Sequence, residues 1–81
     1  MSEHNERYRH LLNKARKAMR CGRGAWAVQS TGEKVAVALV LNRADWLEEI
    51  GYAIAEAIER AGQVWVSMIP EIARQLAEVE I

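Results

Sequence analysis

The chain has 81 residues and equal numbers of basic and acidic side chains, 11 of each, so its formal net charge at pH 7 is zero. A chain of this length forms one small domain, residues 1–81, with a core that is marginal on its own. Its one cysteine excludes an internal disulfide, and charged residues interrupt its most apolar long window, residues 50–69, which argues against a membrane span.

Residues 7–23 predict an amphipathic helix that carries most of the positive charge. Apolar residues recur in steps of three and four, and Gly22 is a natural stop. The apolar stripe consists of Tyr8, Leu11, Leu12, Ala15, Ala18 and Met19. Residues 1–23 carry seven Lys and Arg against two Glu, a charge of +5, whereas residues 24–81 carry four against nine, a charge of −5. We expect residues 1–5 to fray.

Residues 24–41 predict an antiparallel β-hairpin with its turn in Ser30-Thr31-Gly32-Glu33, because glycine accepts positive φ there. Both faces of the two strands are apolar, so we expect both to be covered. The second strand has few charges to protect its edge, and pairing with a copy of itself would extend the sheet. The candidate dimer-edge residues are Val35, Val37 and Leu39.

A second helix is predicted over residues 43–61. Asn42 resembles an N-cap, with Asp45 three residues later, and Gly62 ends the helix. Its apolar stripe is Trp46, Leu47, Ile50, Ile54, Ala57, Ile58 and Ala61. This stripe is expected to face the core.

Residues 64–69 are rich in strand formers, and the residue before Pro70 is disfavoured in a helix. We therefore predict a third strand followed by a helix that begins at Pro70. The rival is one helix from Val64 onward, with Pro70 in its interior at a cost of about 3 kcal/mol. The predicted fold is α+β, in the order α-β-β-α-β-α or, in the rival case, α-β-β-α-α, with the hairpin packed against amphipathic helices.

The sequence contains no recognisable catalytic, metal or phosphate motif. Cys21 and His10 are eleven residues apart, about 16 Å along a helix, which is too far for a nucleophile and its base. No HxxxH, CxxC or complete glycine-rich loop is present. We therefore expect no cofactor and no enzyme activity, the alternative being an enzyme whose site is built at a dimer interface.

Two binding functions are compatible with this composition. The basic helix 7–23 is typical of a nucleic-acid contact, but the neutral chain and the lack of interleaved aromatic residues weaken that interpretation. We favour a small cytoplasmic protein-interaction module that forms a homodimer and binds a further, unidentified protein, because a reducing compartment suits a chain without disulfides. The candidate partner-binding residues are Arg9, Lys14, Arg16, Lys17, Arg20, Arg23 and Trp65.

Overall fold

The computed structural model describes residues 3–79, which form six helices and no strand. The helices are α1 (Glu3–Cys21), α2 (Arg23–Ala27), α3 (Thr31–Val40), α4 (Ala44–Glu49), α5 (Ile54–Ala61) and α6 (Gln63–Val79). The predicted α+β fold is therefore wrong. Of residues 1–5, for which we predicted fraying, residues 1 and 2 lie outside the described part and residues 3–5 belong to the first turn of α1.

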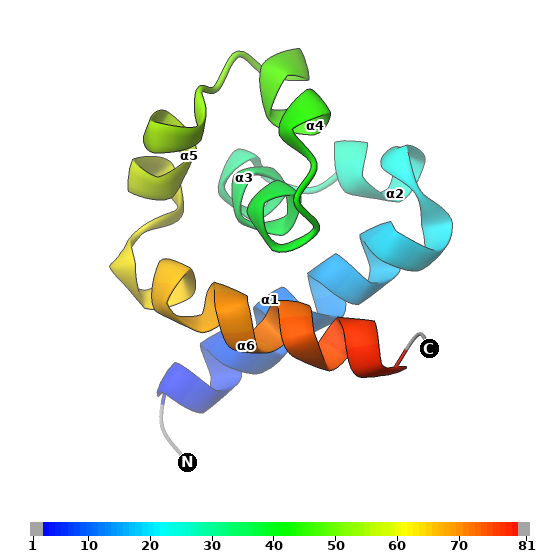
Figure 1. Ribbon diagram of the computed structural model, residues 1–81, viewed down its shortest axis with the longest axis vertical. Helices are drawn as coiled ribbons and strands as arrows, with labels where there is room; N and C mark the ends of the chain where they lie inside the picture. The colour runs from blue at the N-terminus through cyan, green and yellow to red at the C-terminus, as the bar shows by residue number, and fades with distance from the viewer. Residues whose placement is uncertain (1–2, 80–81) are drawn as a thin grey trace.

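Helix α3 occupies the centre of the molecule and contacts all five other helices (Figure 1). Its sequence is apolar on every side from Val35 to Val40, and only Leu39 in that run is half-buried rather than buried. A helix that is hydrophobic all round needs partners on all sides. The arrangement of the molecule follows from this need, since α1 and α6 lie side by side below α3 in Figure 1 and α2, α4 and α5 surround the rest.

Helix α1 confirms the first predicted element. Its stripe faces the core, with Leu11 and Ala15 fully buried and Tyr8 and Met19 half-buried. Gly22 ends the helix in the left-handed region at φ 83°, and its N–H donates to the carbonyl of Ala18. Glycine adopts this conformation without the Cβ penalty of other residues, which explains the stop.

The predicted hairpin over residues 24–41 is wrong, because this segment forms α2 and α3. The residues assigned to its turn are the N-terminus of α3: the Ser30 hydroxyl accepts from the Glu33 N–H, and the Glu33 carboxylate accepts from the Ser30 N–H. This reciprocal pair is a capping box. The proposed dimer edge is lost with the strand, since Val35 and Val37 are fully buried in α3 and Leu39 is half-buried.

The predicted helix 43–61 is split in two, and Asn42 is not its N-cap. Asn42 lies at φ 56° just after α3, where the N–H of Arg43 donates to Ala38 and that of Asn42 to Leu39. These two bonds form a Schellman motif, so Asn42 ends a helix. Gly51, at φ 81°, ends α4 with the same pattern of bonds. Gly62 ends α5, as predicted.

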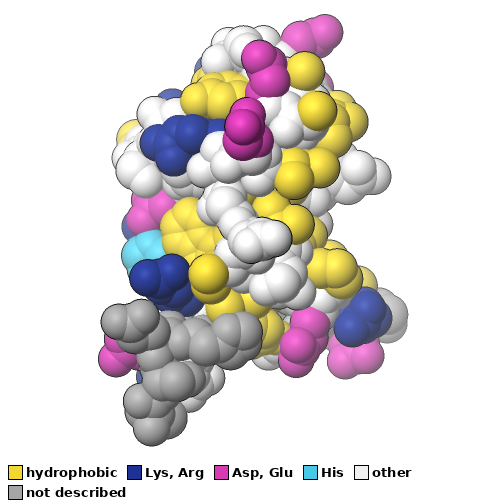
Figure 2. Space-filling view, turned by 90° about the vertical axis from the view of Figure 1, so that its left-hand side faces the viewer, with side chains coloured by type: hydrophobic (Ala, Val, Ile, Leu, Met, Phe, Trp, Pro, Cys, Tyr) yellow, Lys and Arg dark blue, Asp and Glu magenta, His cyan; other side chains and the backbone are white. Residues whose placement is uncertain are grey.

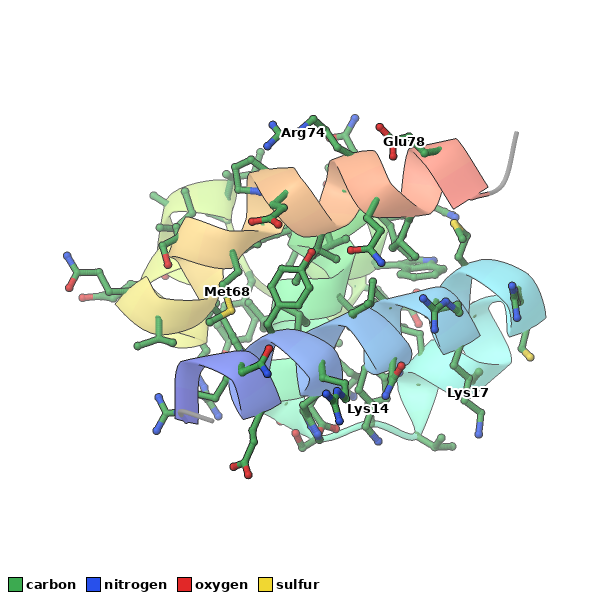
Figure 3. All side chains as sticks on the ribbon, turned by 90° about the horizontal axis from the view of Figure 1, so that it is seen from below. Lys14, Lys17, Met68, Arg74 and Glu78 are labelled. Carbon is green, nitrogen blue, oxygen red and sulfur yellow. The ribbon has the colours of Figure 1, made fainter. Side chains whose placement is uncertain are left out.

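Helix α6 is continuous across Pro70, so the predicted third strand is wrong and the rival interpretation of residues 64–79 is right. Met68, Ile72 and Leu76 recur every four residues and are all buried. Met68 lies between α6 and α1 in Figure 3. Burying three such side chains contributes about 1.5–3 kcal/mol each, which outweighs the cost of about 3 kcal/mol for the interior proline.

Candidate protein-interaction site

Four large hydrophobic side chains are exposed among the described residues, and three of them belong to α5 and the start of α6. Ile54, Ile58 and Val64 are 57%, 46% and 41% exposed, while the fourth, Val28, stands apart at the end of α2 with 84% exposed. Ile54 and Ile58 are four residues apart, so they lie on one side of α5, and Ala57 between them is fully buried. The two isoleucines therefore project from the molecule.

Helix α5 is short, and its ends fix where these isoleucines lie. The Glu56 carboxylate accepts from the N–H of Ala53 at 3.0 Å, which closes the first turn. At the other end, Gly62 turns the chain directly into α6 at φ 88°. Val64 follows within two residues, so the exposed side chains of α5 and of the start of α6 are close in the chain.

A hollow of about 300 Å³ lies where α5 meets α6 and the start of α1. It is lined by Arg7, Ala61, Gly62, Gln63, Val64 and Trp65. Figure 2 shows a band of hydrophobic side chains on this side of the molecule, with acidic and basic side chains on its flanks. We call Ile54, Ile58, Val64 and the residues of this hollow the α5–α6 face.

Trp65 is the only residue of the predicted binding set that lines this hollow. It is half-buried, and its ring is stacked on that of His10, with 6.1 Å between centroids and 6° between planes. Its indole nitrogen is buried and has no hydrogen-bond partner within the described residues. A buried N–H without an acceptor costs about 1–3 kcal/mol, so packing must hold this side chain in place.

Two of the predicted basic residues form ion pairs with acidic residues of the same chain. Lys14 lies 3.8 Å from the Glu33 carboxylate, which also accepts from His10 Nε2 at 2.7 Å. Partial burial raises the pKa of Glu33. The hydrogen bonds from His10 and the Ser30 backbone, together with the charge of Lys14, have a larger effect in the opposite direction, so the pKa of Glu33 is lowered. Arg23 pairs with Glu49 across α2 and α4.

The other predicted basic residues lie along α1 away from the core. Arg9, Lys17 and Arg20 are exposed, and Arg16 is half-buried with a long 3.4 Å bond to the Asn13 amide. Figure 3 shows Lys17 beside Lys14 on one edge of α1. The structure thus separates the predicted set into Trp65 at the hollow, Lys14 and Arg23 in ion pairs, and an exposed basic edge on α1.

A second hollow of about 330 Å³ lies between α1, α2 and α4, with Arg23, Arg43 and Trp46 in its lining. The Arg43 guanidinium lies 4.3 Å from the Trp46 ring centre and donates two hydrogen bonds to Asp45, which hold the pKa of that carboxyl below its ordinary value. Because both arginines already bind carboxylates, this hollow presents no free cation to an anionic ligand.

Among the side chains that the structure describes, no group of three or more His, Cys, Asp and Glu is arranged to hold a metal ion. The described helices include none with the length and apolar character needed to cross a bilayer. Comparison of the chain with protein-family models, curated proteins and solved structures finds no significant match.

The sequence analysis missed the α5–α6 face, because Ile54 and Ile58 were placed on a stripe expected to be buried. The signal that was available is Gly51, which separates α5 from α4. A helix of eight residues with Ile54, Ala55, Ala57, Ile58 and Ala61 carries apolar residues over more of its circumference than one side can bury. Some of them must therefore face outward.

Proposed function

We propose that this chain is a small protein-interaction module that binds through the α5–α6 face. The observation that carries the proposal is that Ile54, Ile58 and Val64, three of the four exposed large hydrophobic side chains, belong to α5 and the start of α6, where Val64 and Trp65 line a hollow. Contiguous exposed apolar surface next to an aromatic side chain is characteristic of protein interfaces. The cytoplasm is the proposed compartment, since the exposed thiol of Cys21 has no disulfide partner.

A cross-linking experiment in cells that produce the chain tests this function. A photoreactive amino acid at Ile58 is expected to give protein cross-links, because this side chain would lie inside the interface. The matched control places the same amino acid at Val28, which is more exposed and follows α2, the helix on the opposite side of α3 from α5 (Figure 1). Equal cross-linking at both positions, or none at Ile58, would contradict the proposal.

A second candidate function is nucleic-acid binding by the exposed basic edge of α1. It is supported by Arg9 and Lys17, which are exposed and form no ion pair among the described residues. Binding of this kind weakens steeply with salt. Mixed DNA and RNA should then bind at low salt, and Arg16→Glu with Lys17→Glu should abolish that binding without unfolding the chain. No binding at low salt rejects this function.

A further inference from the structure

The α5–α6 face carries both a projection and a recess. Ile54 and Ile58 project from α5, and the hollow beyond Ala61 begins one turn after Ile58. A surface with both shapes can fit a second copy of itself, because a two-fold axis brings the projection of each copy to the recess of the other. An isologous dimer needs this self-complementarity.

The charges of the same face are also mixed. Figure 2 shows acidic and basic side chains on the flanks of its hydrophobic band, and the Arg7 side chain lines the hollow. A partner of one charge sign would meet like charges on part of this rim, whereas a second copy offers both signs. The zero formal net charge of the chain also removes the long-range repulsion between copies.

We propose that the α5–α6 face binds the α5–α6 face of a second copy of this chain, with the α5 isoleucines of each copy against the hollow of the other. This proposal rests on the proposed function, since it names the partner of the same surface. It replaces the strand-edge dimer, for which the described residues provide no strand. Such a dimer also buries additional apolar surface, and a chain of this length buries too little by itself.

Sedimentation equilibrium of the purified full chain over a range of concentrations tests the proposal. The wild type is expected to approach twice the mass of one chain at high micromolar concentration. Ile58→Lys should raise the dimer dissociation constant by about tenfold or more, because it places a charge in the apolar centre of the interface. Val28→Lys is the matched control and should change this constant less than twofold.

Far-UV circular dichroism shows whether each variant keeps its helices. If Ile58→Lys unfolds, Ile58→Ala provides the measurement, since alanine favours helix and removes only the projecting side chain. A wild type that stays monomeric at high micromolar concentration overturns the dimer, as do equal dissociation constants for the variants at Ile58 and Val28. If the purified chain is monomeric while position 58 cross-links to a different protein in cells, the dimer fails and the proposed function stands. If neither experiment gives the expected result, both the dimer and the proposed function are rejected.

Discussion

His10 Nε2 donates a 2.7 Å hydrogen bond to the carboxylate of Glu33, and so joins α1 to the N-terminal cap of α3. The same imidazole ring is stacked on Trp65 of α6. This side chain of α1 therefore contacts both α3 and α6, which with α1 form most of the core, and the ionisation of Glu33 affects how firmly α1 and α3 are joined.

The lowered pKa of Glu33 predicts an acid-sensitive contribution to stability. A carboxyl with a lower pKa in the folded protein stabilises it above the unfolded value, near 4.5, and this contribution disappears as the pH falls through the folded pKa. Glu33→Gln should lower the free energy of unfolding at pH 7. At pH 3 the free energies of unfolding of the variant and the wild type should differ less than they do at pH 7. Urea titrations at both pH values measure this, and a pH-independent difference would contradict it.

The capping box predicts that Ser30→Ala costs about 1 kcal/mol of stability, because the N–H of Glu33 loses its acceptor. Thr31→Ala is the matched control, since Thr31 is exposed and begins α3 without a capping bond. Chemical denaturation of both variants provides the comparison. If residues 30–33 were a hairpin turn, as the sequence analysis predicted, the two substitutions would differ little.

Two tryptophans should respond differently to phenylalanine. The Trp26 N–H donates to the Lys34 carbonyl at 2.8 Å, and its ring is stacked on Trp46 with centroids 4.8 Å apart. Trp26→Phe should cost about 0.5–1.5 kcal/mol for this hydrogen bond, and more for the gap that the smaller ring leaves in the core. Trp65→Phe should cost less, since the Trp65 N–H has no acceptor to lose. The reverse order in urea unfolding would refute this assignment.

Pro70→Ala should stabilise the protein, by up to about 3 kcal/mol, if α6 continues through this position. Alanine restores an N–H that can donate to the Val66 carbonyl four residues earlier. A helix that began at Pro70 would gain nothing from the change, because proline is favourable in the first turn. The midpoint of thermal unfolding separates the two cases, and a lower midpoint for the variant would exclude a continuous helix.

Helix α1 was predictable from the sequence because its apolar stripe has a clear period and Gly22 marks its end. The run from Val35 to Leu41 was not, since a stretch that is apolar on all sides has the same composition in a buried strand and in a buried helix. The serine and glutamate of residues 30–33 could have decided it, because their spacing is that of a capping box. The turn-forming glycine between them favoured the wrong interpretation.

Tertiary packing decided the other elements. Pro70 opposes a helix locally, and only the burial of Met68, Ile72 and Leu76 against the rest of the molecule overrides it. Similarly, Asn42 can begin one helix or end another, and its left-handed backbone settles the choice. In the candidate site, Trp65 could be predicted from its residue type. The projecting side chains of α5 could not, because the break at Gly51 determines which of them face outward.

The central position of α3 has a consequence for how the molecule opens. Each of its neighbours covers a different part of the helix, so detaching any one of them exposes apolar residues to water. Partial unfolding that frees the α3 backbone is therefore costly. The amide hydrogens of Val35 to Val40 should exchange with solvent more slowly than all others in the described chain, at the rate of global unfolding. The ends of α1 and α6 can fray without this cost, and their amides should exchange first.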